Sequence, residues 1–268
     1  MLLAIDVGNT NTVLGLYRLA SEGVAAEMVA NWRITTPSRR TTDEFGMLLR
    51  NLFALKDLKM EAVDGIAISS VVPPLDSTLR QVCEIYFKVK PLLIEPGVKT
   101  GLPVLTDNPT EVGADRIVNC VAAFERFGGA CIVVDMGTAT TFDVVSKKGE
   151  FLGGAIAPGL GISADALFTR AARLPRIDVK KPAKVIGTGT VDNIQIGLYY
   201  GYIGLVDGIL ERMIAEMGPE TNTVATGGLA KLIAGGSKYI GAVDEMLTLT
   251  GLRIIYERNL ERHKKRGI

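Results

Sequence analysis

Two short segments, about half a chain apart, combine an acidic residue, a glycine and hydroxyl or amide groups. Asp6–Thr10 reads Asp-Val-Gly-Asn-Thr, and Asp135–Thr140 reads Asp-Met-Gly-Thr-Ala-Thr. A carboxylate at a strand end can hold a cation, glycine lets a phosphate approach the backbone, and hydroxyl or amide groups donate to phosphate oxygens. The repeated pattern predicts two phosphate-binding hairpins with one nucleotide held between two related halves. Ordinary hairpin turns are the alternative, because they use the same residue types.

Each segment lies between two runs that have the composition of β-strands. The run Leu2–Ile5 precedes the first segment and residues 130–134 precede the second, and both runs are apolar enough for buried strands. Val13–Tyr17 and Phe142–Val145 follow them and are rich in β-formers. Each half is therefore predicted to begin with a strand, a tight turn and a second strand.

The rest of the chain alternates between strand and helix patterns, which is typical of an α/β fold. Helical spacing covers residues 43–55, 73–85, 111–127, 162–173 and 191–217. Further strands are predicted at residues 28–34, 65–72, 92–95 and 222–225. A last helix is predicted from Val243 to about Lys264, with an interruption near Gly251. We expect an N-terminal half, residues 1–118, and a C-terminal half, residues 119–268.

The composition excludes several classes of protein. With 268 residues and 47% hydrophobic content the chain can bury a substantial core, and its net charge of +1 lacks the basic footprint of a nucleic-acid binder. The absence of a positive leader and of a long apolar segment predicts a cytoplasmic protein without a membrane partner.

Cysteine and histidine usage restricts the available chemistry. Cys83, Cys120 and Cys131 are odd in number and lie among apolar residues, which favours reduced thiols in the core. The single histidine, His263, lies in a basic tail and rules out a histidine-based triad or a multi-histidine metal site. Any general acid or general base must therefore be a carboxylate or a lysine.

Five motifs in order carry a family resemblance: Asp6–Gly15, Gly113–Arg116, Asp135–Thr140, Gly153–Gly159 and Thr226–Gly228. Together they resemble the type III pantothenate kinases. The duplicated halves are also similar to the acetate and sugar kinase, heat-shock ATPase and actin-like superfamily, which implies two ribonuclease H-like halves with a nucleotide cleft between them. The family resemblance implies ATP-dependent phosphorylation of pantothenate to 4'-phosphopantothenate, the first step of coenzyme A biosynthesis.

The resemblance assigns the substrate segment and the base. It implies that Asp115 accepts the proton of the attacking hydroxyl, whereas a helix cap with a surface Asp115–Arg116 pair is the alternative. Arg116 offers a fork of donors for the carboxylate of pantothenate or for a phosphate. The implied substrate residues are Gly113, Ala114, Asp115, Arg116 and Thr190. Thr190 is equally suited to be a helix N-cap, and Thr106 stands where the family has a tyrosine.

The resemblance also implies how ATP and cations are held. The implied ATP-binding residues are Asp6, Val7, Gly8, Asn9, Thr10, Asn11, Thr12, Val13 and Thr138. Asp6 would orient Mg²⁺ through water, because Mg²⁺ keeps several waters and few carboxylates. Asp135 would hold a monovalent cation, K⁺ or NH₄⁺, with a second magnesium site as its rival role. Thr226–Gly228 would meet the adenosine, unless it is a plain strand-to-helix turn.

The long second-half helix carries Tyr199, Tyr200 and Tyr202 on a broad apolar surface. Because the family is homodimeric, we expect this helix to form a dimer contact, with an all-round buried core helix as the alternative. Two other functions compete with pantothenate phosphorylation: a kinase of another small alcohol, and a non-enzymatic ATP-binding regulator of the same fold. A filament-forming or chaperone-type ATPase is disfavoured by the modest length.

Overall fold

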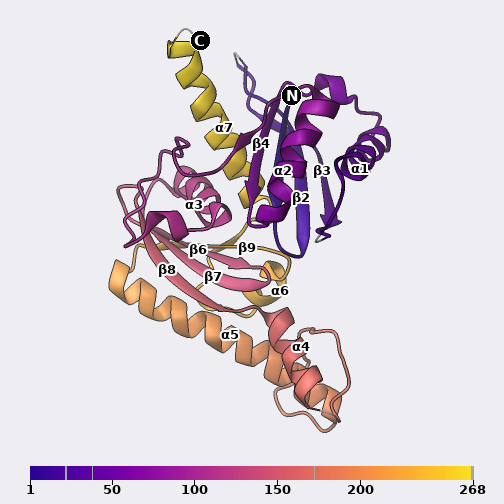
Figure 1. The fold of residues 1–268 in the computed structure, drawn as a ribbon. Helices are drawn as coiled ribbons and strands as arrows, with labels where there is room; N and C mark the ends of the chain where they lie inside the picture. Colours follow the sequence, from indigo (N-terminus) through magenta and orange to yellow (C-terminus); the bar gives the residue numbers. More distant parts are fainter. Residues whose placement is uncertain (22, 38, 172, 267–268) are drawn as a thin grey trace. The chain divides into compact units, whose positions relative to one another are not determined.

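The computed structural model describes residues 1–21, 23–37, 39–171 and 173–266. The chain forms two compact units, each with its own five-stranded sheet (Figure 1). Unit 1 contains Met1–Gly101, Asn108–Ala122 and the segment from Thr248 onward, and unit 2 contains Leu102–Asp107 and Ala123–Leu247. This grouping by packing is distinct from the expected duplicated halves, whose boundary after residue 118 stays a prediction.

The sheet of unit 1 has the strand order β3-β2-β1-β4-β5. Its strands are β1 (Leu2–Val7), β2 (Asn11–Arg18), β3 (Glu27–Thr35), β4 (Gly65–Ser70) and β5 (Leu92–Leu93). The first three strands pair antiparallel, whereas β4 runs parallel to β1 and β5 runs parallel to β4.

The sheet of unit 2 repeats this topology. Its strands are β6 (Cys131–Met136), β7 (Ala139–Val145), β8 (Phe151–Pro158), β9 (Asn222–Thr226) and β10 (Ala242–Val243). The order β8-β7-β6-β9-β10 has the same pattern of antiparallel and parallel pairs as the sheet of unit 1. The prediction of an α/β fold built from two related halves is confirmed.

The helices match the periodicity of the sequence to within a few residues at their ends. The longer ones are α1 (Thr42–Ala54), α2 (Pro73–Val82), α3 (Ala114–Phe127), α4 (Leu160–Arg170), α5 (Thr190–Met217) and α7 (Leu247–Arg266). Shorter turns of helix are η1 (Met60–Ala62), η2 (Cys83–Phe87), η3 (Pro109–Glu111) and α6 (Ala230–Ala234). Among the described residues, no helix has both the length and the apolar character needed to cross a membrane.

Strand alternation gives each central strand two different faces. In β1, Leu3, Ile5 and Val7 belong to a core shared with apolar residues of α1 and α2. Because neighbouring side chains on a strand point to opposite faces, Asp6 lies on the other face of the sheet. In β6 the same alternation separates Asp135 from the core residues Val134 and Met136.

The interruption expected in the last helix is wrong. α7 continues through Gly251, and it begins at Leu247 because Val243 is paired in β10. A Cβ atom on Gly251 would overlap the backbone oxygen of Val118 in α3. Glycine is therefore present so that two helices can approach closely, and not to end one of them.

The three cysteines lie in the core as expected. Cys83, Cys120 and Cys131 are buried, and none forms a disulfide. Burial raises the pKa of the Cys83 and Cys131 thiols to about 12, so both stay protonated at neutral pH. These two thiols therefore pack as small apolar groups and are poor nucleophiles.

Candidate active site

The first phosphate motif forms the predicted hairpin turn between β1 and β2. The Gly8 N–H donates to the Asn11 carbonyl oxygen at 3.0 Å, which closes the turn. A Cβ atom on Gly8 would lie only 3.1 Å from that oxygen, so the tight turn favours glycine. Asn9 and Thr10 are exposed at the tip. The turn thus presents polar groups beyond the end of β1.

Asp6 lies where β1 and β4 run side by side. It is opposite Ser69 in the parallel register, and beyond the last pair the Val71 N–H donates to the Val7 carbonyl oxygen at 3.0 Å. The Ser69 hydroxyl is fully buried and has no hydrogen-bond partner among the described residues. Sequence reasoning missed Ser69, because only the pairing of β4 with β1 makes it a neighbour of Asp6.

Asp115 lies in the first turn of α3, beside the end of β4. Its Oδ1 atom accepts a hydrogen bond from the backbone N–H of Arg116 at 2.8 Å. A Cβ atom on Gly113 would lie 2.6 Å from this Oδ1 and 3.8 Å from a methyl carbon of Val71. Val71 is hydrogen-bonded to Val7 at the end of β1. Within unit 1, Asp115 therefore lies close to the end of β1, where the first hairpin turn begins.

Burial raises the pKa of Asp115 above the usual range for an aspartate. The hydrogen bond from the Arg116 backbone and the positive charge of Arg116 oppose this rise without cancelling it. A carboxylate with raised proton affinity is a better proton acceptor, because the driving force for proton transfer to it is larger. The site therefore contains one carboxylate tuned toward the role of a base.

The second phosphate motif forms the matching turn in unit 2. The Gly137 N–H donates to the Ala139 carbonyl oxygen at 3.0 Å, and Thr138 is exposed at the tip. Asp135 is half-buried and lies opposite Thr226 of β9. The two hairpins therefore place an aspartate at the same position before the turn.

Two glycine motifs pack directly against this second hairpin. The Gly159 N–H donates to the Thr138 carbonyl oxygen at 3.2 Å, and a Cβ atom on Gly159 would lie 2.6 Å from the Gly137 oxygen. Gly227 has a φ of +94°, and its Cβ atom would lie 2.6 Å from the Met136 oxygen. Both positions need glycine, since any larger residue would push the backbone away from the turn.

Thr190, a proposed substrate residue, and Thr106, which stands where the family has a tyrosine, differ in their surroundings. Thr190 is the first residue of α5 and is exposed, while Gly189 is the N-cap, so the alternative of Thr190 as the cap is wrong. The Thr106 hydroxyl is buried, and no described residue hydrogen-bonds to it. Its methyl group lies 3.8 Å from the position of a Cβ atom on Gly153.

The tyrosines of α5 divide between the core and the surface. Tyr199 and Tyr202 are buried in the core of unit 2, whereas Tyr200 is exposed, so the alternative of an all-round buried core helix is wrong. α5 therefore has a buried face and an exposed face.

The carboxylates are suited to cations that take most of their ligands from elsewhere. Within the described ranges, no three His, Cys, Asp or Glu residues gather closely enough to hold a metal ion. Mg²⁺ commonly binds through one or two carboxylates together with water and substrate phosphates. Single aspartates such as Asp6 and Asp135 fit that pattern.

The two units, each with a five-stranded sheet of the same topology, define a two-half α/β fold that other solved structures share. The chain is similar to a glucomannokinase from Arthrobacter sp. strain KM that uses inorganic polyphosphate or ATP, with 13% identity, a TM-score of 0.50, and coverage of 98% of this chain and 99% of that one. It is also similar to the activator of 2-hydroxyisocaproyl-CoA dehydratase from Clostridium difficile, with 12% identity, a TM-score of 0.52, and coverage of 99% and 96%. At these identities the likeness shows the fold alone.

Sequence comparison narrows the class to one family. The family model described as type III pantothenate kinase matches residues 2–212. The type III pantothenate kinase of Koribacter versatilis (strain Ellin345) is 63% identical over 99% of this chain and 98% of that protein. That of Acidobacterium capsulatum is 62% identical over 100% and 98%. The chain belongs to the type III pantothenate kinase family and is a kinase.

Proposed function

We propose that this chain transfers the terminal phosphoryl group of ATP to the primary hydroxyl of pantothenate. The product is 4'-phosphopantothenate, and the reaction is the first step of coenzyme A biosynthesis. Membership of the family supports the choice of substrate over another small alcohol. The single observation that carries the chemistry is a desolvated carboxyl, that of Asp115, beside the end of β4 and close to a phosphate hairpin.

Asp115 serves as the proton acceptor for the pantothenate hydroxyl. Phosphoryl transfer depends mainly on positioning and on neutralising charge, and one residue must orient the attacking oxygen. The raised pKa of Asp115 strengthens it as a base, and the hydrogen bond from Arg116 fixes one of its oxygens. The other oxygen is then free to receive the hydroxyl proton.

Each hairpin turn carries residues that we assign to ATP binding. The residues from Asp6 to Val13 supply backbone and side-chain donors on one hairpin, and Thr138 supplies a hydroxyl on the other. Asp6 would orient Mg²⁺, and Asp135 would hold a monovalent cation, K⁺ or NH₄⁺. These cations supply neutralising charge around the triphosphate when they are bound.

Pantothenate is held by the segment that carries the base. Gly113 and Ala114 leave room for the substrate, and Arg116 offers a guanidinium to its carboxylate. Thr190 contributes a hydroxyl contact.

The decisive test compares product formation by the protein with and without the Asp115 carboxylate. Purified protein is incubated with ATP, Mg²⁺, K⁺ and pantothenate, and phosphopantothenate is measured by mass spectrometry. We expect product from the unchanged protein and a loss of about 10²- to 10⁴-fold in rate for Asp115→Asn, the usual range for a general base. The exposed carboxylate of Glu61 provides the matched control, Glu61→Gln, which should keep full activity.

The alternatives give different results in the same assay. ATP consumption without a phosphorylated acceptor would contradict the kinase assignment. Phosphorylation of a different alcohol, with pantothenate ignored, would leave the role of Asp115 intact and refute the substrate. Equal rates for Asp115→Asn and the unchanged protein would remove Asp115 from the mechanism.

A further inference from the structure

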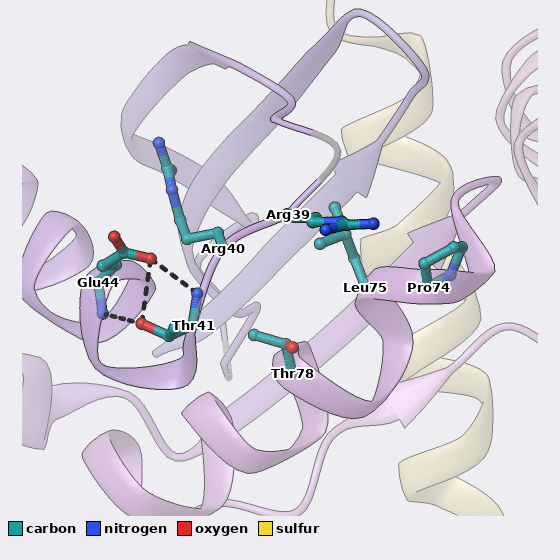
Figure 2. A pocket seen from close by; sticks show the side chains of 7 residues that line it. All are labelled: Arg39, Arg40, Thr41, Glu44, Pro74, Leu75 and Thr78. Atoms are coloured by element: carbon teal, nitrogen blue, oxygen red, sulfur yellow. Dashed lines mark hydrogen bonds between the residues drawn. The ribbon is translucent and has the colours of Figure 1, made fainter.

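A pocket of about 510 Å³ lies on unit 1 between the beginnings of α1 and α2 (Figure 2). Its walls include Arg39, Arg40 and Thr41 on one side and Leu75 and Thr78 of α2 on the other. The volume falls within the range of roughly 300 to 1,000 Å³ that is typical of small-molecule sites. We call it the arginine pocket.

The two arginines have uncommitted donors. One terminal nitrogen of Arg40 is buried and donates to no partner among the described residues, and its guanidinium carbon lies 5.7 Å from the centre of the Phe45 ring. Arg39 is exposed, and within the described ranges it forms no ion pair or hydrogen bond. Figure 2 shows the two side chains pointing in different directions from neighbouring backbone positions. Both arginines line the pocket, so its wall includes two guanidinium-bearing side chains.

The one carboxylate in the pocket wall is already engaged. Glu44 accepts hydrogen bonds from the Thr41 backbone N–H at 2.8 Å and from the Thr41 hydroxyl at 3.0 Å, which completes the capping box of α1. These bonds, with a smaller contribution from the charge of Arg40, lower the pKa of Glu44 and keep it ionised. Two guanidinium groups against one carboxylate leave the pocket with excess positive charge.

The segment that carries the arginines is attached to the first phosphate hairpin. The Thr36 N–H donates to the Thr10 carbonyl oxygen at 2.9 Å, and the hydroxyls of Thr36 and Thr12 are 2.8 Å apart. Arg40 also borders a small inner cavity that Val7 and Thr12 line. The walls of the arginine pocket itself include none of the described residues 6–13. The pocket is thus a neighbour of the hairpin and has its own lining.

We propose that the arginine pocket binds a phosphate-bearing metabolite at the same time as ATP occupies its own site. Guanidinium groups match phosphate oxygens in geometry and charge, and their bonds to phosphate are stronger than neutral hydrogen bonds. The Thr78 hydroxyl adds a neutral donor, and the N-terminal end of α1 adds partial positive charge. The pocket volume indicates a ligand larger than a single phosphate ion, such as an organic phosphate or diphosphate.

The test uses inorganic pyrophosphate as the probe and the full chain as the protein. The nucleotide site is first saturated with Mg²⁺ and a non-hydrolysable ATP analogue, and pyrophosphate is then titrated by calorimetry. We expect binding that weakens by about tenfold or more in Arg39→Gln and in Arg40→Gln, because each removes a charge-assisted bond. Arg50→Gln removes an exposed arginine of α1 outside the pocket and should bind as the unchanged protein does.

A second measurement on the unchanged protein makes the test independent of variant folding. Pyrophosphate should shift the backbone amide NMR signals of residues 39–44 and 75–78 while the ATP analogue is bound. Shifts confined to residues 6–13 would place the anion in the nucleotide site and overturn the proposal. Failure of pyrophosphate to bind beside the analogue, or equal affinity in all four proteins, would overturn it as well.

Discussion

Asp115 combines a raised pKa with a hydrogen-bonded carboxylate oxygen. It is desolvated enough that its pKa rises, yet one of its oxygens is held by a charge-neutral backbone donor, the N–H of Arg116. Gly113 makes this arrangement possible, because a side chain there would occupy the place of the carboxylate. The position of the Asp115 carboxylate therefore depends on the absence of a Cβ atom at residue 113.

The pH dependence of activity should report the state of Asp115. Its pKa is raised, so the carboxylate becomes protonated at a higher pH than an ordinary aspartate does. We expect kcat/KM to fall as the pH is lowered through this pKa, since a protonated carboxyl cannot accept the hydroxyl proton. Steady-state kinetics across the acid range measures this, and an acid limb that persists unchanged in Asp115→Asn would contradict it.

The contribution of Asp115 to folding stability should fall as the pH rises, whereas its contribution to activity should grow. Because the folded-state pKa of Asp115 lies above its unfolded value, its contribution to stability is fully present below the unfolded pKa and is lost as pH rises through the folded one. At neutral pH, Asp115→Asn should therefore melt no lower than the unchanged protein. Loss of activity with retained stability would separate catalysis from folding.

Gly113→Ala should impair catalysis by displacing the base. The new methyl carbon would lie 2.6 Å from the Asp115 Oδ1 atom, so the carboxylate must move. We expect kcat/KM to fall by about 10- to 100-fold, because a small misplacement of a reacting group has a large effect on rate. Gly129→Ala is the control, since its methyl carbon would have no neighbour nearer than 4.0 Å. Equal activity of the two variants would count against the argument.

At the scale of elements, glycines determine how closely segments approach. Gly159 and Gly227 let two motifs pack onto the second hairpin, and Gly251 lets α7 pack onto α3. Gly154 lets β8 pair with β7, because its Cβ atom would overlap the Phe142 oxygen. The glycine-rich segment around it forms a strand to which the sequence pattern assigned no element.

Gly251→Ala should destabilise unit 1 although alanine is the better helix former. Its methyl carbon would overlap the backbone oxygen of Val118, so α3 and α7 must separate. We expect a loss of about 1–3 kcal/mol in the free energy of unfolding, the usual range for overpacking. In contrast, Gly204→Ala in α5 enters open space and should be neutral or stabilising. Denaturant unfolding of both variants measures the difference, and similar midpoints would refute the packing explanation.

At the scale of the whole molecule, each unit has the same sheet topology and the same placement of an aspartate before its turn. The repetition explains why the two motifs are recognisable half a chain apart.

Assembly into oligomers is also a property of the whole molecule. Tyr200 is exposed on α5 next to the buried Tyr199, which offers an aromatic group for contact with a second copy.

We propose that the protein is a homodimer. Sedimentation equilibrium should give about twice the chain mass of 28.7 kDa at micromolar concentration. Tyr200→Glu should weaken the dimer, because it places a charge where an aromatic contact is expected. Glu211→Gln, at an exposed position further along α5, is the control. A single species of 28.7 kDa for the unchanged protein would contradict the proposal.

The sequence alone determined the features that depend on neighbours along the chain. Strand alternation and turn chemistry predicted both hairpins, and helical spacing predicted α1 and α5, because such patterns follow directly from backbone geometry. The family followed from motifs that are themselves local. Asp6, Asp115 and Asp135 were singled out on this basis.

Only the tertiary structure decided which distant residues meet. It placed Ser69 beside Asp6, Val71 beside Gly113, and Arg39 with Arg40 in a pocket against α2. It also kept α7 continuous, since the close approach of another helix explains a glycine that local propensity would take as a break. These outcomes depend on packing between segments far apart in the chain, and a pattern read along the chain carries no information about that packing.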